Sequence, residues 1–168
     1  MNKTDLARKS KDSIILDKLS KDEDWYVRSK VAENKNTSPE ILDRLSKDKN
    51  PNVRYGVAIN KNTSPETLIN MFWKEPNAEI RMAIYNKLGP EEILSKAEYE
   101  VLDVQDNYRL LNIKHPTKKN CKYLEMINPS TGLKHLEGVH PLIKSIKSAL
   151  KWRNQGFKPD IITQRGVK

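Results

Sequence analysis

The chain has 168 residues, a net charge of +9 and a single cysteine, and 36% of its residues are hydrophobic against 32% charged. No segment approaches the roughly 18–20 apolar residues that span a bilayer, and the first residues, Met-Asn-Lys-Thr-Asp-Leu, contain no apolar signal core. The lone Cys121 excludes an internal disulfide and a multi-thiolate metal site. We therefore expect a cytoplasmic protein without a membrane segment.

A 26-residue repeat runs through the first 97 residues, and several residue types recur at this spacing. The recurring positions are Leu16, Leu42, Leu68 and Leu94, then Leu19, Leu45, Met71 and Ala97, and finally Val27-Arg28, Val53-Arg54 and Ile80-Arg81, of which the last pair follows after 27 residues. Periods of about 20–50 residues indicate stacked supersecondary units, which usually present an extended surface to a partner.

Each repeat is predicted to begin with a short helix. Ser38-Pro39-Glu40 and Ser64-Pro65-Glu66 each supply a capping hydroxyl, a proline at the first helical position and a carboxylate in the first turn. The helix that follows Ser38 is expected to bury three residues, Ile41, Leu42 and Leu45. Asn50-Pro51 then caps and begins the next helix.

The second helix of the repeat ends at an asparagine-rich segment. In the central copy this helix carries Val53, Val57 and Ala58, and Asn60-Lys61-Asn62 follows. We expect this segment to end the helix because Asn tolerates the left-handed conformation and bonds to its own backbone in turns. Because no such unit buries its apolar face alone, about three units stack into a short α-solenoid whose outer copies act as caps.

The repeat pattern resembles a known family. Val-Arg-x-x-Val-Ala-x-Asn-x-Asn-Thr-x-Pro-Glu-x-Leu-x-x-Leu runs from Val27 to Leu45 and again, ending in Met, from Val53 to Met71. It resembles the leucine-rich repeat variant, a bacterial relative in shape of the HEAT and armadillo repeats, over roughly residues 13–97. The resemblance implies a helical scaffold for partners. Some members carry an iron-sulfur cluster on a cysteine-rich N-terminal segment, which this chain lacks, so no cofactor is implied.

Residues 99–137 have a different composition and predict a small antiparallel β-sheet. Tyr99–Val104, Tyr108–Ile113 and Tyr123–Ile127 are short, rich in aromatic and branched residues, and bounded by turn residues. Asn-Pro-Ser-Thr-Gly at residues 128–132 then predicts a hairpin to a strand over residues 133–139.

A helix over residues 142–154 and a basic tail are predicted to follow the sheet. The hairpin, the Val-x-Pro and the Ala-Leu-x-Trp-Arg-Asn segments resemble a C-terminal module of uncharacterised bacterial and viral proteins. The predicted fold class is α+β. Its parts are the helical repeats of residues 1–98, a sheet and helix in residues 99–156, and the tail of residues 157–168.

The recurring arginines Arg28, Arg54 and Arg81 form the first candidate site. In equivalent places of successive repeats they would form a ladder that a protein or a phosphate backbone could follow. The structural alternative is that each arginine pairs bidentately with an acidic neighbour across the repeat junction, such as Asp22, Asp48 or Glu75.

Two tryptophans that interrupt the repeat pattern are candidate partner-binding residues. Trp73 stands where the other copies have Lys21 and Lys47, and Trp25 stands where the next copy has Pro51. We expect both positions to be exposed, and exposed tryptophan is a frequent interface anchor. The alternative for Trp73 is that it seals the last repeat against the sheet module.

The positive charge is concentrated in the C-terminal part. Residues 99–168 contain 13 Lys and Arg against 6 Asp and Glu, whereas residues 1–98 contain 18 against 16. In the C-terminal helix Ile143, Ile146 and Leu150 predict an apolar stripe that packs on the sheet. Beside it lies a basic row that either is a solvated face or binds phosphates. The residues of the row are Lys144, Lys147, Lys151, Arg153 and Lys158.

Catalytic and metal motifs are absent from the sequence. It contains no phosphate-binding glycine loop, no His-Glu-x-x-His, no Gly-x-Ser-x-Gly and no Cys-x-x-Cys. His135 and His140 flank Glu137, but a five-residue step alternates faces along a strand, and Cys121 with His135 lacks a third orienting group. We therefore expect no catalytic or metal-ligating residue.

Two functions remain open from the sequence. The preferred interpretation is a non-enzymatic adaptor that holds a protein partner on the helical repeats through Trp25, Trp73 and the arginine ladder. The alternative is a nucleic-acid-binding accessory protein that contacts phosphates through the basic C-terminal module and the ladder. The absence of glycine-aromatic nucleic-acid motifs argues against sequence-specific recognition.

Overall fold

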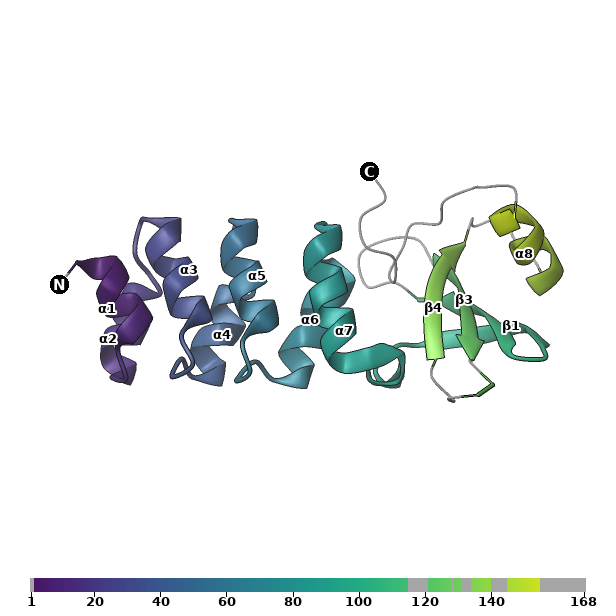
Figure 1. Cartoon of the computed structure of the whole chain (residues 1–168), viewed down its shortest axis with the longest axis horizontal. Helices are drawn as coiled ribbons and strands as arrows, with labels where there is room; N and C mark the ends of the chain where they lie inside the picture. The colour runs from purple at the N-terminus through teal and green to yellow at the C-terminus, as the bar shows by residue number, and fades with distance from the viewer. Residues whose placement is uncertain (1, 115–120, 128, 131–133, 140–144, 155–168) are drawn as a thin grey trace. The chain divides into compact units, whose positions relative to one another are not determined.

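The computed structural model describes residues 2–114, 121–127, 129–130, 134–139 and 145–154. Within these ranges helices combine with a small antiparallel sheet (Figure 1), which confirms the α+β class. The chain divides into two compact units, Met1–Lys87 and Leu88–Lys168. Each unit is described separately.

The first unit consists of short helices in pairs. Figure 1 shows α1, α3 and α5 side by side, and α3 packs against both of its neighbours. The helices are α1 (Lys3–Lys9), α2 (Ser13–Leu19), α3 (Trp25–Glu33), α4 (Pro39–Leu45), α5 (Pro51–Ile59), α6 (Pro65–Lys74) and the first part of α7 (Ala78–Ser95). The pairs α2–α3 and α4–α5, and α6 with the start of α7, coincide with the 26-residue sequence repeats.

Most of the helix starts follow the predicted capping residues. Pro39, Pro51 and Pro65 each open a helix, and the Ser64 hydroxyl accepts a hydrogen bond from the Thr67 N–H at 3.1 Å. Ser38 differs, because its hydroxyl caps no N–H of the described helix α4. The core positions predicted for α4 and α5 are all buried.

Helix α5 ends at the predicted asparagine-rich segment, and α3 ends at the equivalent Asn34. Asn34 and Asn60 cap these helices in extended backbone conformations, with φ of −71° and −69°, so the expected left-handed conformation is wrong. Each side-chain oxygen accepts a hydrogen bond from the N–H two residues later, at 2.8 Å from Asn36 and 2.9 Å from Asn62. This turn frees each side-chain amide to reach the preceding repeat.

Small residues let α3 and α5 approach closely. A Cβ atom added to Gly56 would lie 2.9 Å from the Ala32 Cβ. The next junction is wider, since α5 and α7 approach each other less closely than α3 and α5 do. Tyr55 stands in α5 where α3 has Ser29.

Helix α7 is interrupted close to the sequence position at which the chain divides into its two units. Gly89 has φ 76° and ψ 167°, a region essentially restricted to glycine, and Pro90 follows it. The backbone hydrogen bonding of the helix is interrupted there because Pro90 has no N–H to donate to the preceding turn. The boundary between the units therefore falls between Lys87 and Leu88, earlier than the predicted module boundary after Glu98.

The second unit contains a four-stranded antiparallel sheet in the order β1-β2-β3-β4. The strands are β1 (Tyr99–Gln105), β2 (Tyr108–Ile113), β3 (Cys121–Ile127) and β4 (Lys134–Val139). The register shifts between Val101 and Asp103, and Asp106 adopts a positive φ of 47° in the predicted turn after β1. The predicted strands are confirmed within one or two residues at their ends.

Helix α8 (Ile146–Asn154) packs on one face of this sheet. Ile146 and Ala149 are fully buried against Leu110 and Leu124, and the Ile146 N–H donates to Asp103 Oδ2 at 2.8 Å. The predicted apolar stripe is confirmed for Ile146 and, as a partly buried neighbour of this core, for Leu150. Residues 140–144, including Ile143 and Lys144, lie outside the described residues.

No helix in the described ranges is both long enough and apolar enough to cross a membrane.

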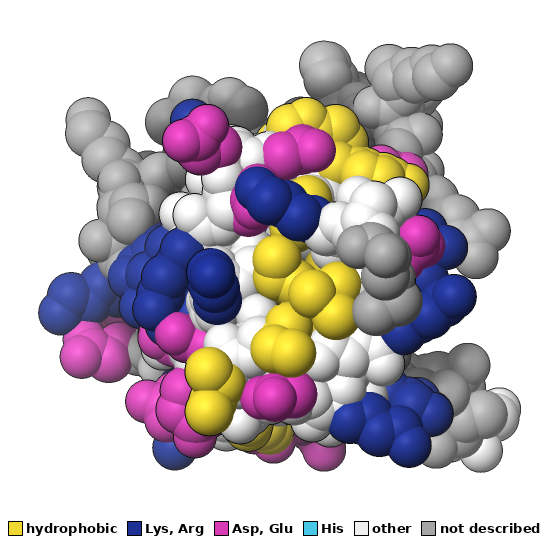
Figure 2. All heavy atoms as spheres, turned by 90° about the vertical axis from the view of Figure 1, so that its left-hand side faces the viewer, with side chains coloured by type: hydrophobic (Ala, Val, Ile, Leu, Met, Phe, Trp, Pro, Cys, Tyr) yellow, Lys and Arg dark blue, Asp and Glu magenta, His cyan; other side chains and the backbone are white. Residues whose placement is uncertain are grey.

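The face that Figure 2 shows has a few apolar side chains among charged ones. In α2, at the N-terminal end of the first unit, Ile14 is 78% exposed. The equivalent residues of the next two repeats, Glu40 and Glu66, are exposed as well.

Candidate functional site

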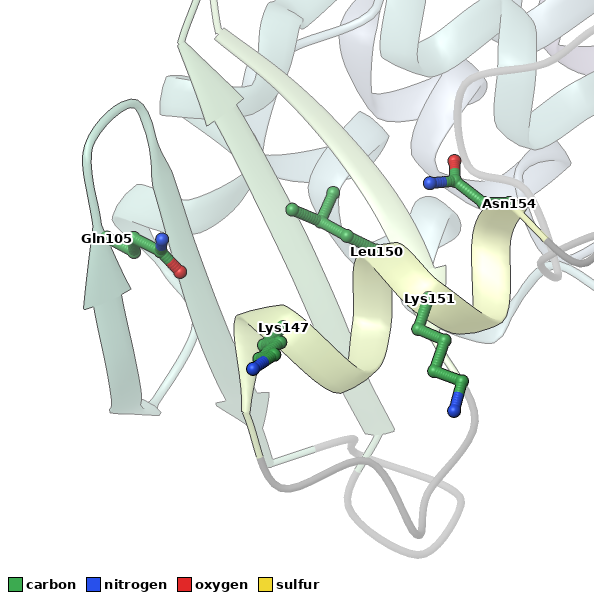
Figure 3. Close-up of a pocket in the computed structure, with 5 residues that line it drawn as sticks. All are labelled: Gln105, Lys147, Leu150, Lys151 and Asn154. Atoms are coloured by element: carbon green, nitrogen blue, oxygen red, sulfur yellow. The ribbon is translucent and has the colours of Figure 1, made fainter.

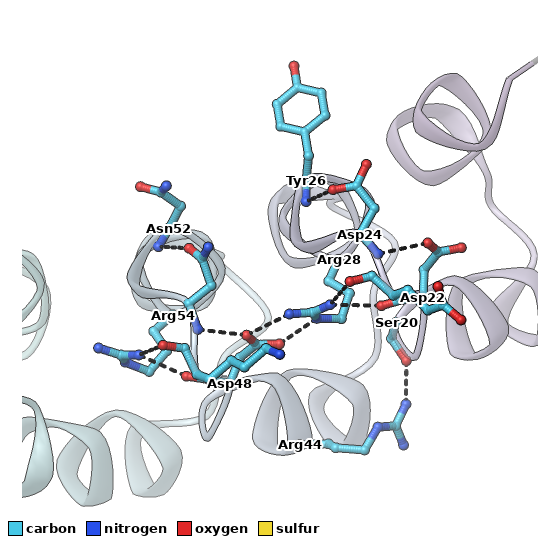
Figure 4. Close-up of polar contacts among 12 residues, drawn as sticks. Ser20, Asp22, Asp24, Tyr26, Arg28, Arg44, Asp48, Asn52 and Arg54 are labelled. Atoms are coloured by element: carbon cyan, nitrogen blue, oxygen red, sulfur yellow. Dashed lines mark hydrogen bonds and ion pairs between the residues drawn. The ribbon is translucent and has the colours of Figure 1, made fainter.

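Two arginines of the predicted ladder, Arg28 and Arg54, bridge consecutive helix pairs, and Figure 4 shows the Arg28–Asp48 contact. Arg28 donates from Nε to Asp48 Oδ2 at 2.6 Å and from Nη2 to Asp48 Oδ1 at 3.0 Å, while Nη1 donates to the carbonyls of Asp22 and Glu23. The Arg28 and Asp48 side chains are each only 9% exposed. The guanidinium is thus used entirely inside the chain, as the structural alternative predicted.

Arg54 repeats the same arrangement one junction later. It donates bidentately to Glu75 at 2.7 and 2.9 Å, and its Nη1 donates to the carbonyls of Asp48 and Lys49. Arg81 preserves the carbonyl contacts, donating to Glu75 at 2.7 Å and to Pro76 at 2.9 Å. In all three cases the guanidinium closes the loop that precedes its own helix. We therefore remove Arg28 and Arg54 from the candidate partner-binding residues.

The environment of Asp48 favours its charged form. Burial alone would raise the pKa of this carboxyl, but hydrogen bonds from the Arg28 guanidinium and the Asn50 N–H lower it below its ordinary value. Conversely, the hydrogen bond to Glu75 raises the pKa of Arg54. These shifts favour the charged forms of Asp48 and Arg54, which preserves the electrostatic link between the helix pairs.

Asparagine amides form a second set of bridges that sequence reasoning missed. Asn34 Nδ2 donates to the carbonyls of Ala7 and Ser10, and Asn60 Nδ2 donates to those of Ala32 and Asn34 at 2.6 and 2.9 Å. At the third junction Lys87 Nζ takes the same role, donating to Asn60 O at 2.5 Å. Burial lowers the pKa of Lys87. The recurring Asn-x-Asn-Thr was the sequence signal for these contacts.

Trp73 is buried, so the expectation of an exposed position is wrong. It is 7% exposed, and its ring packs edge-on against Phe72 with centroids 5.1 Å apart. The cause is the length of α6, which continues to Lys74 whereas α4 ends at Leu45. The added turn carries the tryptophan into the core. That Trp73 seals the repeats against the sheet module stays a prediction.

Trp25 remains exposed, together with other large side chains on α3 and α5. Trp25 is 39% exposed and contacts Tyr26 edge-on at 5.7 Å, and the Lys30 ammonium lies 5.1 Å from the Tyr26 ring centroid. Figure 4 shows Tyr26 and Asn52, which occupy equivalent places, pointing to the same side and away from the arginine pairs. On α5, Tyr55 and Ile59 are also exposed. We call Trp25, Tyr26, Tyr55 and Ile59 the apolar surface of α3 and α5.

In the second unit a groove of about 610 Å³ lies between α8 and the end of β1. Figure 3 shows its lining, in which Lys147 and Lys151 project from successive turns of α8. Both lysines are exposed, and neither forms an ion pair within the described residues. Gln105 and Asn154 add amide groups to this lining. The remaining predicted phosphate contacts, the Lys144 and Lys158 residues and the Arg153 side chain, lie outside the described part.

The opposite face of the sheet holds a buried ion pair. Arg109 and Glu125 are direct partners across β2 and β3, and the Arg109 Nε donates to Glu125 Oε2. The Glu125 side chain is fully buried, and its Oε1 has no hydrogen-bond partner among the described residues. The hydrogen bond to Glu125 raises the pKa of Arg109. Tyr99 also interacts with the Arg109 guanidinium, so the pair belongs to a small polar cluster on this face of the sheet.

No group of three or more His, Cys, Asp and Glu side chains in the described ranges could hold a metal ion. His115, His140 and the side chains of Cys121, His135 and Glu137 lie outside those ranges. The expectation that the chain has no catalytic or metal site therefore stays a prediction.

Comparisons with protein-family models, with curated proteins and with solved structures gave no match to this chain.

Arg28→Ala is expected to lower the free energy of unfolding by about 3–5 kcal/mol, because removal of one member of a buried ion pair leaves the other uncompensated. Arg28→Lys restores only part of the loss, since an ammonium cannot donate bidentately. Urea unfolding followed by circular dichroism measures both. The control is Arg8→Ala on the exposed end of α1. A loss from Arg28→Ala no larger than that of the control contradicts the structural role.

Acid is expected to weaken the same junction. Because the pKa of Asp48 is lowered in the folded chain, its contribution is complete above the unfolded value of about 3.9 and is lost as the pH falls through the folded value. Asp48→Asn should therefore be less stable at pH 7 and should lose less stability than the wild type between about pH 4 and pH 2. Urea midpoints across this range test the expectation, and equal slopes for both chains would refute it.

Proposed function

We propose that this chain is a non-enzymatic adaptor that holds a protein partner on an α-solenoid of about three two-helix repeats, related in shape to the leucine-rich repeat variant and HEAT repeats. The repeated junctions support the solenoid. Arg28 and Arg54 make equivalent contacts one repeat apart, as do Asn34 and Asn60. Such contacts between neighbours only are typical of stacked repeats.

The observation that carries the binding function is the apolar surface of α3 and α5. Large apolar side chains that are 39–48% exposed lie on two adjacent helices, although smaller or polar residues occupy the equivalent places of other repeats. In the repeat alignment, Tyr26 of α3 is equivalent to Asn52 of α5. Tyr55 and Ile59 of α5 are equivalent to Ser29 and Glu33 of α3. Exposed tyrosine and tryptophan bury a large area on binding and have few rotamers to restrict.

The charges near this surface suit a protein partner better than a nucleic acid. Arg28 and Arg54 are occupied by carboxylates, which leaves Lys30 as a cation beside the aromatic rings, and Lys30 itself pairs with Glu33 at 2.7 Å. A phosphate backbone requires several available cations. Arg28 and Arg54 are therefore not part of the proposed interface.

A second candidate function is nonspecific contact with nucleic-acid phosphates through α8. The groove that Lys147 and Lys151 line supports it, because two exposed ammonium groups one turn apart can follow a phosphate chain while the Gln105 and Asn154 amides add hydrogen-bonding capacity. This proposal depends on the C-terminal excess of positive charge and involves none of the ladder arginines.

The adaptor proposal predicts that Tyr26→Ala combined with Tyr55→Ser reduces partner capture at least about tenfold, the effect of losing interface anchors worth roughly 1.4 kcal/mol or more. Tagged wild-type and variant chains are used to capture material from the cytoplasm of the native cell after nuclease treatment, and proteins enriched by the wild type are quantified by mass spectrometry.

The matched control is Ile14→Ser, which removes an exposed apolar side chain outside the apolar surface of α3 and α5. Equal capture by the double variant and the control would eliminate this surface. Melting curves of all three chains verify that the substitutions leave the fold intact.

The phosphate proposal predicts that affinity for a fluorescent single-stranded oligonucleotide falls steeply between about 50 and 200 mM salt and decreases further in Lys147→Glu with Lys151→Glu. Fluorescence anisotropy provides the measurement, and Lys35→Glu with Lys61→Glu on the first unit is the control of equal net charge. Affinity that is independent of salt, or equal in the α8 variant and the control, would exclude phosphate binding by α8.

A further inference from the structure

The first repeat junction contains an arginine site that is separate from the ladder. Arg44 of α4 donates from Nη2 to Asp17 Oδ1 at 2.6 Å and to Ser20 Oγ at 2.5 Å, both on the preceding repeat. Figure 4 shows the contact between Arg44 and Ser20. Lys21 meanwhile holds the other carboxylate oxygen of Asp17 at 2.6 Å. The Arg44 guanidinium thus donates hydrogen bonds to one carboxylate and one hydroxyl of the preceding repeat.

The second junction has the same acceptors in the same local geometry. Asp43 and Ser46 stand 26 residues after Asp17 and Ser20. The Ser46 hydroxyl donates to the Asp43 carbonyl at 2.6 Å, as the Ser20 hydroxyl does to Asp17 at 2.6 Å. Lys47 holds Asp43 Oδ2 at 3.0 Å, the counterpart of the Lys21 contact. Both acceptors are therefore oriented as they are in the occupied copy.

The guanidinium itself is missing at the second junction. Asn70 occupies the place of Arg44, and its side chain is shorter by several atoms. A groove of about 660 Å³ lies there, with Asp43, Ser46 and Asn70 in its lining. Within the described residues Asp43 Oδ1 receives only the Thr67 hydroxyl at 3.3 Å, and the nearby Arg54 is already paired with Glu75.

We infer that this groove binds an arginine side chain of a partner protein, which donates to Asp43 Oδ1 and Ser46 Oγ as Arg44 does to their counterparts. A planar guanidinium fits this acceptor pair better than an ammonium, because it donates from several directions in a fixed plane. Both acceptors belong to one helical turn whose internal bonds already fix them, so binding requires little ordering.

The lysines at the groove specify the residues beside the arginine. Lys49 and Lys74 line it, are exposed and form no ion pair within the described part of the chain. Alone they would attract an anion, but they are long side chains free to extend into water, whereas the Asp43 and Ser46 acceptors are held in place. The partner segment thus carries acidic residues next to its arginine.

Three capped tripeptides test the site on the full-length ¹⁵N-labelled chain. Acetyl-Glu-Arg-Glu-amide is the probe, acetyl-Glu-Lys-Glu-amide tests the guanidinium, and acetyl-Gln-Arg-Gln-amide tests the flanking carboxylates. We expect saturable shifts of the Asp43 and Ser46 amide resonances with the first peptide, several-fold weaker binding of the third and none above background for the second.

Asn70→Arg provides the matched variant, because an arginine at this position rebuilds the Arg44 contacts and fills the groove. It should raise the melting temperature by about 2–4 °C, the shift expected for one exposed ion pair, and abolish the peptide-induced shifts. Asp43→Asn removes the acceptor charge and should abolish them without stabilisation. It provides an independent test if Asn70→Arg does not fold.

Equal shifts for the arginine and lysine peptides, no saturable shift with the wild type, or undiminished binding by Asp43→Asn each overturns the inference. The inference rests on the proposed function only in assigning the arginine to a protein. Tyr26→Ala changes a different surface and should bind the peptide like the wild type, so partner capture lost in Tyr26→Ala but unchanged in Asn70→Arg would refute this site and leave the adaptor proposal standing.

Discussion

The first unit depends on bidentate arginine–carboxylate contacts that connect each helix pair with the next. Arg28 reaches Asp48 and Arg54 reaches Glu75, and each guanidinium also takes up two carbonyls of the loop before its own helix. A single side chain thereby fixes a loop and the spacing of two repeats. The carboxylates are largely buried, so leaving one of them unpaired would cost more free energy than an exposed ion pair contributes. The junction is therefore stable only in a geometry that keeps each carboxylate paired with its guanidinium.

The two sides of each junction use different chemistry. Charged pairs lie at the loops that precede α5 and α7, whereas the amides of Asn34 and Asn60 satisfy carbonyls at the opposite helix ends without introducing charge. Lys87 replaces the amide at the last junction, where α5 and α7 are farther apart and a longer side chain is required. The proposed arginine site also results from a difference at one aligned position. Asn70 stands where the preceding repeat has Arg44, and it leaves without a guanidinium the acceptors that an arginine would occupy.

The sequence predicted the architecture better than the site. Regular leucine and valine spacing determined the helices, because burial of an apolar stripe depends on the period alone. It also predicted the arginine–carboxylate alternative, since the acids recur with the arginines.

Trp73 was misjudged because the added turn of α6 changes the environment of an aligned position. The asparagine bridges were missed because a turn preference explained Asn60 adequately, and only the fold brings the Ala32 carbonyl to its amide. On α3 and α5 the break in the repeat pattern predicted the exposure of Trp25, whereas Tyr26, Tyr55 and Ile59 were missed although their aligned residues are smaller or polar.

The close approach at Gly56 also has a dynamic consequence. Where α3 and α5 meet with almost no side chain between them, each helix is covered by the other and by the Asn60 bridge, whereas α1 has only one helical neighbour of its layer and α7 stands farther away. Local opening in such an assembly starts at the least covered elements. Amide hydrogen exchange should therefore be slowest in the middle of α3 and α5 and become faster toward both ends of the first unit, so the proposed partner surface would lie on the slowest-exchanging helices of that unit.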